Sequence, residues 1–86
     1  MYTVSMTDRA RAELRALPPK AIASMLTAFG RLESWPNHGL DVRKLEGPLE
    51  GLWRVRRGDY RALFDVDTRH REILITRVGT RQRVYG

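Results

Sequence analysis

The chain has 86 residues, no cysteine, a hydrophobic content of 42% and a formal net charge of +6. A chain of this length can bury one two-layer core, and the lack of cysteine excludes disulfide bonds and thiolate metal sites. The positive charge indicates an anionic partner, which for a basic protein is most often a nucleic acid.

The first half of the chain has the pattern of a short strand followed by two helices. Residues 2–6 alternate between apolar and polar side chains, as a strand with one buried face does. Thr7 or Asp8 can cap a helix over about residues 9–17, and Pro18-Pro19 ends that helix. In the second helix, the apolar residues that fall at helical spacing and predict a face laid on a sheet are Ile22, Met25, Leu26, Phe29 and Leu32.

The segment WPNHG, residues 35–39, has turn-forming residues and ends the second helix. The remaining sequence has the pattern of strands at residues 42–45, 52–57, 60–66 and 72–78, with a turn at 67–71. From the order β-α-α-β-β-β we predict an α+β domain. Its two N-terminal helices pack on one face of a four-stranded, mostly antiparallel sheet.

The segment LWRVRRGDYRALF places four arginines on two neighbouring strands. Gly58-Asp59 predicts a two-residue turn of type II′, because glycine supplies the positive φ that this turn requires. Such a turn fixes the register of both strands. Since side chains alternate between the two faces of a sheet, Arg54, Arg56 and Arg61 then lie together on the face opposite the helices. The residues predicted to face the helices are Trp53, Val55, Tyr60, Ala62 and Phe64.

Three arginines on one sheet face can be interpreted in two ways. They can form a solvated surface with Asp65 or Glu50 as the counter-charge, or they can form a site for an anion such as phosphate. Like charges directly across a strand pair are unfavourable, so a sequence shaped only for stability would not place them there. Residues 51–86 also carry nine Lys and Arg against four Asp and Glu, which favours the anion site.

The end of the chain adds two arginines and a tyrosine. Arg81, Arg83 and Tyr85 follow the strand at residues 72–78, after Gly79 breaks its pattern. They can be a frayed tail, as at most chain termini. If the last strand lies beside the strand at residues 60–66, however, Arg81 and Tyr85 reach the rim of the basic face.

Three segments together resemble the RelE/ParE superfamily of bacterial type II toxins: KLEGPLEGLWR at residues 44–54, GDYR at 58–61 and VGTRQRVY at 78–85. The resemblance covers almost the whole chain and implies a single toxin domain over residues 1–86 with a microbial-RNase-like fold. The RelE-like members are mRNA interferases, which implies cleavage of mRNA in the ribosomal A site by attack of the 2′-hydroxyl on the adjacent phosphate.

The resemblance also implies the residues of the site. The implied catalytic residues are Arg54, Arg61, Arg81 and Tyr85. The further expected RNA or phosphate contacts are Arg56, Lys44 and Arg83. Arginine cannot readily accept a proton, so Tyr85 is the candidate general base, whereas the two histidines fall in predicted loops. Thr80 stands where many relatives carry histidine, and we expect no C-terminal helix of the kind that some relatives have.

Other functions and partners follow from the same resemblance. ParE-like toxins share the fold but inhibit DNA gyrase, and an inactive RNA-binding relative is a third alternative. A cognate antitoxin is expected to form a hetero-oligomer with this chain. Its segment would cover the basic face or its rim and the apolar sheet edge, and its acidic residues would complement the charge. No metal or organic cofactor is expected, because no cluster of His, Asp or Glu has ligand spacing. No segment predicts a signal peptide or a membrane span, so we expect a cytoplasmic protein without membrane contact.

Overall fold

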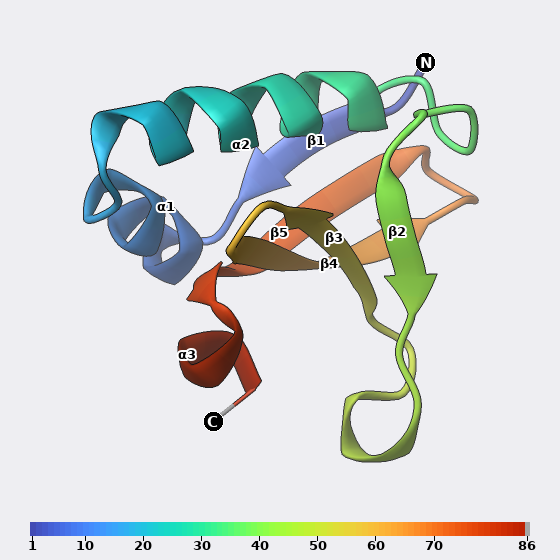
Figure 1. Ribbon diagram of the computed structural model, residues 1–86. Coiled ribbons are helices and arrows are strands. Elements are labelled where there is room, and N and C mark those ends of the chain that lie inside the picture. The colour runs from blue at the N-terminus through green and yellow to red at the C-terminus, as the bar shows by residue number, and fades with distance from the viewer. Residues whose placement is uncertain (86) are drawn as a thin grey trace.

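The computed structural model describes residues 1–85. In chain order its elements are β1 (Thr3–Met6), α1 (Asp8–Arg15), α2 (Pro19–Leu32), β2 (Asp41–Lys44), the 3-10 helix η1 (Gly47–Leu49), β3 (Trp53–Arg57), β4 (Tyr60–Asp67), β5 (Glu72–Thr80) and α3 (Arg81–Tyr85) (Figure 1). Among these residues, none of the helices has the length and apolar character that a membrane crossing would need.

The sheet has five strands in the order β1-β5-β4-β3-β2. The α+β class and the two N-terminal helices on the sheet are confirmed, but the prediction of four strands is wrong, because all five segments with a strand pattern join the sheet. β1 runs parallel to β5, and the other neighbouring strands are antiparallel. β1 and β2 therefore form the two edges, and the sheet is mixed.

The hairpin of β3 and β4 has the register that its turn predicts. Arg56 lies opposite Arg61, and Trp53 lies opposite Phe64. Gly58 has a φ of +60°, and Asp59 does not share the positive φ, as a type II′ turn requires. The local chemistry of the turn thus sets which side chains of both strands face the helices.

The α1 and α2 helices begin as their sequences indicate, but the buried face of α2 differs from the prediction. Thr7 caps α1, since its Oγ1 accepts a hydrogen bond from the Ala10 N–H at 3.1 Å. On α2 the buried face includes Met25 and Phe29, whereas Leu26 is 48% exposed. Ala21, Ala28 and Leu32 complete this face. The small alanines let the helix lie close to the sheet, and Leu26 falls on its flank.

The main core fills the space between the helices and the sheet. Val55, Ala62 and Phe64 are fully buried there, as the alternation of β3 and β4 predicts. The loop after α2 closes one end, because Trp35 packs edge-on against Trp53 at 5.0 Å and against Phe64 at 5.7 Å between ring centroids. This core leaves the opposite face of the sheet free of the two long helices.

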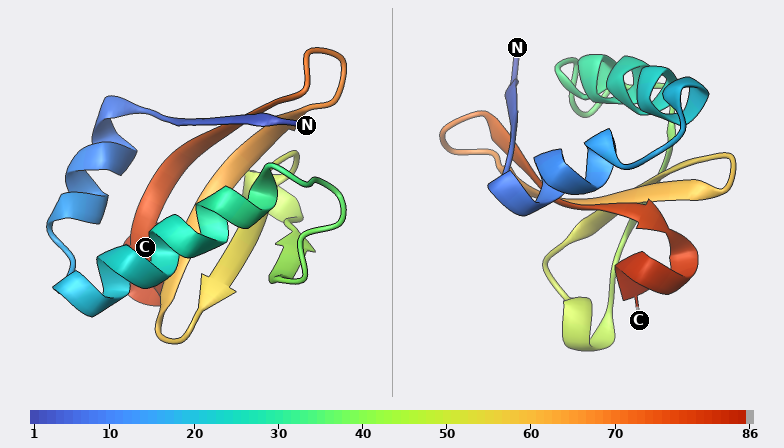
Figure 2. Two further views of the ribbon diagram at one scale, coloured as in Figure 1. Left: turned by 90° about the horizontal axis from the view of Figure 1, so that it is seen from above. Right: turned by 90° about the vertical axis from the view of Figure 1, so that its left-hand side faces the viewer.

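The C-terminal residues form a short helix, so the expectation of no C-terminal helix is wrong. β5 does not break at Gly79 but continues to Thr80, and α3 then folds back onto β4 and β5. Gly79 lies directly against this helix, since a Cβ atom there would be 3.5 Å from Cβ of Arg83 and 3.7 Å from Cγ2 of Val84, which are ordinary van der Waals distances. Together with the β2–β3 connection, α3 projects from the side of the sheet opposite α2 (Figure 2).

Candidate functional site

An open groove of about 520 Å³ lies on the sheet face that the two long helices do not cover. Its lining consists of Asp41, Arg43, Arg54, Arg56, Arg61, Arg81 and Tyr85. We call it the arginine groove. β2, β3 and β4 supply its floor, and α3 supplies Arg81 and Tyr85. The groove therefore joins residues from two sequence segments that are separated by the whole of β5.

Strand register explains why the floor of the arginine groove is so basic. Arg43 lies directly opposite Arg54, and Arg56 lies directly opposite Arg61. Each such pair of like charges costs on the order of a few tenths of a kcal/mol to 1 kcal/mol. Asp41 lies opposite Arg56 and is the one acidic residue of the lining. The groove thus concentrates positive charge at a cost to the stability of the sheet.

Arg54 is the most buried arginine of the groove. It is 8% exposed, and its Nη2 donates a hydrogen bond to Oδ1 of Asp41 at 3.4 Å. The counter-charge of Arg54 is therefore Asp41 on β2, and not Asp65 or Glu50, which the alternative of a solvated surface invoked. Because a half-exposed carboxylate offsets only part of the charge, the guanidinium of Arg54 remains available to an anion in the groove.

The sequence-predicted residues divide into two groups. The structure brings Arg54, Arg56, Arg61, Arg81 and Tyr85 together in the arginine groove. Lys44 lies elsewhere, with its Nζ 5.7 Å from the ring centroid of Trp53, which belongs to the helix-facing side. Arg83 lines a separate cavity between α1, β5 and α3, together with Glu13. Arg57, the fourth hairpin arginine, donates to Oγ of Ser24 on α2 at 3.2 Å.

Asp41 and Arg43 also line the groove, but neither was predicted as a site residue from the sequence. Both lie on β2 with Val42 between them, so the alternation of this strand places them on one face. That alternation was visible in the sequence. The sequence could not show on which face of the sheet the two residues lie, because the irregular connection at residues 45–52 does not fix the register of β2 against β3.

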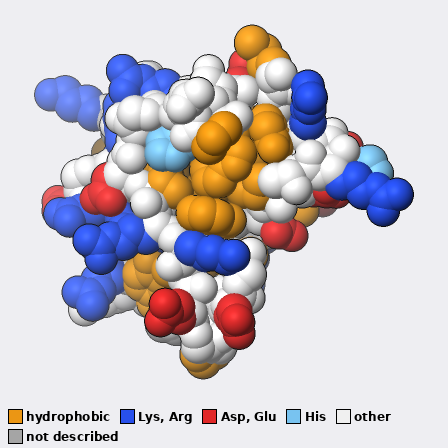
Figure 3. Space-filling view, turned by 90° about the vertical axis from the view of Figure 1, so that its right-hand side faces the viewer, with side chains coloured by type: hydrophobic (Ala, Val, Ile, Leu, Met, Phe, Trp, Pro, Cys, Tyr) orange, Lys and Arg blue, Asp and Glu red, His pale blue; other side chains and the backbone are white. Residues whose placement is uncertain are grey.

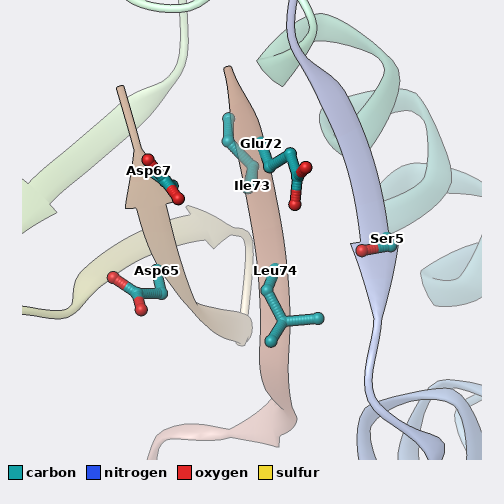
Figure 4. Close-up of a pocket in the computed structure, with 6 residues that line it drawn as sticks. All are labelled: Ser5, Asp65, Asp67, Glu72, Ile73 and Leu74. Atoms are coloured by element: carbon teal, nitrogen blue, oxygen red, sulfur yellow. The ribbon is translucent and has the colours of Figure 1, made fainter. Parts of the chain in front are cut away.

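A second hollow on the same sheet face has the opposite charge. Asp65 and Asp67 on β4, Glu72 and Leu74 on β5 and Ser5 on β1 surround it (Figure 4). The outward residues of β4 therefore change along the strand from Arg61 through Leu63 to Asp65 and Asp67. Basic side chains thus line one hollow of this face and acidic side chains line the other.

The remaining titratable groups do not enter the groove. His38 accepts a hydrogen bond from the Leu40 N–H, and His70 pairs with Asp67 at 2.8 Å, so both histidines lie in loops as expected. Across residues 1–85, no group of three or more His, Cys, Asp or Glu side chains could hold a metal ion. The arrangement of the groove suits an anion such as phosphate, with the Tyr85 phenol at its edge.

Comparison with known proteins identifies relatives over almost the full length. Residues 4–85 match the family model described as the ParE toxin of type II toxin-antitoxin systems, parDE. The toxin RelG of Mycobacterium tuberculosis is 41% identical over 86 residues, which span 98% of this chain and 95% of RelG. The toxin RelE of the same organism is 36% identical, over 98% of this chain and 86% of its own length.

Solved structures show the same fold. The toxin-antitoxin complex RelBE2 of Mycobacterium tuberculosis contains a chain with a TM-score of 0.81 and 38% identity, covering 93% of this chain and 98% of that one. The archaeal RelE-RelB complex of Pyrococcus horikoshii contains one with a TM-score of 0.77 and 32% identity, covering 95% and 97%. The first of these chains was solved in a toxin-antitoxin complex and the second in a RelE-RelB complex.

Proposed function

Because the chain belongs to the RelE/ParE family of type II toxin-antitoxin toxins, we propose that it is a ribosome-dependent endoribonuclease that cleaves mRNA in the A site. Cleavage there would inhibit translation, and the protein would act in the cytoplasm, where ribosomes are. The observation that carries the proposal is the arginine groove, in which four predicted arginines and Tyr85 meet.

The groove suits transesterification of a phosphodiester. In this reaction the 2′-oxygen forms a bond to phosphorus, the bond to the 5′-oxygen breaks, and negative charge gathers on the phosphoryl oxygens. Arg54, Arg61 and Arg81 would stabilise that charge, since fixed guanidinium groups interact more strongly with the transition state than with the ground state. Arg56 would bind a neighbouring phosphate. Lys44 and Arg83 lie outside the groove, where they can contact only a longer stretch of RNA.

Proton transfer needs a group other than arginine, which stays protonated. The 2′-hydroxyl loses a proton and the leaving 5′-oxygen gains one. We assign the first transfer to Tyr85, which is 39% exposed at the edge of the groove. No residue of the groove is assigned to the second transfer. The ribosome would supply that proton donor, which gives a chemical reason for ribosome dependence.

A cognate antitoxin is the partner that we propose for resting cells. On the side of β2, hydrophobic side chains gather at the centre of the molecular face, with Lys and Arg side chains beside them (Figure 3). An antitoxin segment with apolar residues and acidic neighbours would complement both features. Such a segment would cover the rim of the basic face and keep mRNA out.

The test is cleavage of a defined mRNA by the purified protein, with and without ribosomes stalled at a known codon, followed by mapping of the 5′ ends. We expect cuts within the A-site codon only when ribosomes are present. Arg61→Ala should lower the cleavage rate by about 10²–10³-fold, because it removes one donor to the transition state. Arg69→Ala is the matched control: it removes the same charge from the exposed turn after β4, and its rate should stay within about twofold of wild type.

The alternatives give different results in the same experiment. An intact message in every reaction contradicts the nuclease, and inhibition of DNA gyrase would then identify a ParE-like toxin. For an inactive RNA-binding relative, Arg61→Ala would only weaken RNA binding. It would also reduce the slope of log affinity against log salt concentration by about one. Cuts in free RNA would retain the nuclease and reject its dependence on the ribosome.

A further inference from the structure

The α3 helix is too short to hold its own position. It has five residues, whereas isolated helices shorter than about 12 residues are marginal in water. Val84 is its only buried residue, at 4% exposed, and the other four are exposed. Since α3 brings Arg81 and Tyr85 to the arginine groove, some contact from another element has to fix it there.

Arg77 on β5 makes that contact. Its Nη2 donates a hydrogen bond to the carbonyl oxygen of Arg83 at 2.8 Å, and its Nε donates to both carboxylate oxygens of Glu13 at 3.2 Å. The carbonyl groups in the last turn of a helix have no partner within the helix, and a cation there is favourable. One guanidinium therefore ties α3 to α1 across the end of β5.

Glu13 is itself fixed on its other side. Its Oε1 accepts a hydrogen bond from the Val78 N–H at 3.0 Å, at a part of β5 that extends beyond its pairing with β1. Partial burial opposes ionisation of Glu13, but the hydrogen bonds from Arg77 and Val78 outweigh it and hold the pKa of this carboxyl below its usual value. Glu13 is therefore a carboxylate at neutral pH. The pair loses its attraction only as the pH falls through that lowered pKa.

We propose that Glu13 and Arg77 are positioning residues that hold α3 on the sheet and so set the places of Tyr85 and Arg81 in the arginine groove. Neither residue lines the groove, so both act through α3. The inference rests on the proposed nuclease function where it concerns activity. The attachment of α3 by itself does not depend on that function.

Two measurements on the same variants test the proposal. Hydrogen exchange of the backbone amides reports how firmly α3 is held, and cleavage of mRNA on stalled ribosomes reports kcat and KM. In Arg77→Ala we expect amide exchange at Val84 and Tyr85 to rise at least tenfold, while exchange in β3 and β4 stays unchanged. kcat should fall at least tenfold, and KM should stay within about twofold, because the β3 and β4 arginines still bind RNA.

Matched variants separate positioning from charge and folding. Arg15→Ala removes a positive charge from the exposed end of α1 and should match wild type in both measurements. Glu13→Gln retains an acceptor for the Val78 N–H but loses the negative charge. Arg77→Lys retains the positive charge but loses the guanidinium that donates both to Glu13 and to the carbonyl oxygen of Arg83. Both should give intermediate exchange and kcat. If Arg77→Ala fails to fold, these two milder variants decide by the same criteria.

Two results would overturn the proposal. One is exchange of the α3 amides in Arg77→Ala that stays within twofold of wild type. The other is faster exchange with an unchanged kcat, which would mean that the position of α3 does not set activity. If wild type itself cleaves no message, the proposed function fails, and hydrogen exchange alone then decides whether Glu13 and Arg77 hold α3.

Discussion

At the scale of single residues, Arg54 has the surroundings that an anion-binding arginine would need. Withdrawing a guanidinium from water costs several kcal/mol unless other groups satisfy it. Arg54 is 8% exposed, yet its one carboxylate partner, Asp41, is at 3.4 Å and keeps 53% of its side chain exposed. Within residues 1–85, no buried side-chain nitrogen or oxygen lacks a hydrogen-bond partner. The donors of Arg54 that Asp41 leaves free are therefore not sealed from solvent, and Arg54 lines the groove.

The exposed pair of His70 and Asp67 gives a prediction for titration. Their hydrogen bond raises the pKa of His70 and lowers the pKa of Asp67. The stabilisation from a raised histidine pKa is present below the unfolded pKa and is lost as the pH rises through the folded one. We expect an NMR titration to find that His70 deprotonates above the usual pH of a histidine. In Asp67→Asn this shift should disappear; if it persists, Asp67 is not its cause.

At the scale of elements, the β3–β4 hairpin depends on one glycine. Gly58 has a φ of +60° and open space around it, so only backbone strain opposes a side chain there. We expect Gly58→Ala to lower the free energy of unfolding by about 1–2 kcal/mol, measured by chemical denaturation. Gly30 in α2 also has open space but no positive φ, and Gly30→Ala should instead stabilise by about 0.5–1 kcal/mol. Equal effects of the two changes would contradict the argument.

The hairpin also marks how far the sequence could predict the fold and the candidate site. A two-residue turn determines register locally, so the faces of Arg54, Arg56 and Arg61 could be predicted from residues close to them. The register of β2 depends instead on packing across an irregular connection, so the face of Lys44 could not be predicted. The α3 helix could not be predicted either, because five residues show no periodicity and their position depends on Arg77, four residues before the helix begins.

At the scale of the whole molecule, the sheet face opposite the two long helices carries an acidic hollow and a basic groove. Arg61 and Asp65 lie four residues apart on β4 and point to the same side, one into the arginine groove and one into the acidic hollow. The net charge of +6 therefore understates the local charge of the groove. A phosphate backbone would be drawn to one end of this face and repelled from the other, which would orient RNA across the groove.

The same face carries an apolar layer of its own, separate from the main core. Leu63 is 2% exposed on the groove side of β4, Val84 of α3 is 4% exposed, and neither belongs to the core cluster beneath the helices. Phe64, the next residue, is fully buried on the other side of the sheet and contacts Trp35. Two adjacent residues of one strand thus support two different layers.

Truncating these two neighbours should have separable consequences. We expect Phe64→Ala to lower the free energy of unfolding by about 3–5 kcal/mol, a large share of the 5–15 kcal/mol of a typical domain, and to shift native tryptophan fluorescence. Both tryptophans of the chain, Trp35 and Trp53, pack against the main core, so their fluorescence reports on it. Leu63→Ala should cost about 2–3 kcal/mol, leave that fluorescence unchanged and accelerate amide exchange in α3. An equal fluorescence shift in both variants would mean that the sheet has a single coupled core, in which case the groove could not be loosened without loosening the whole fold.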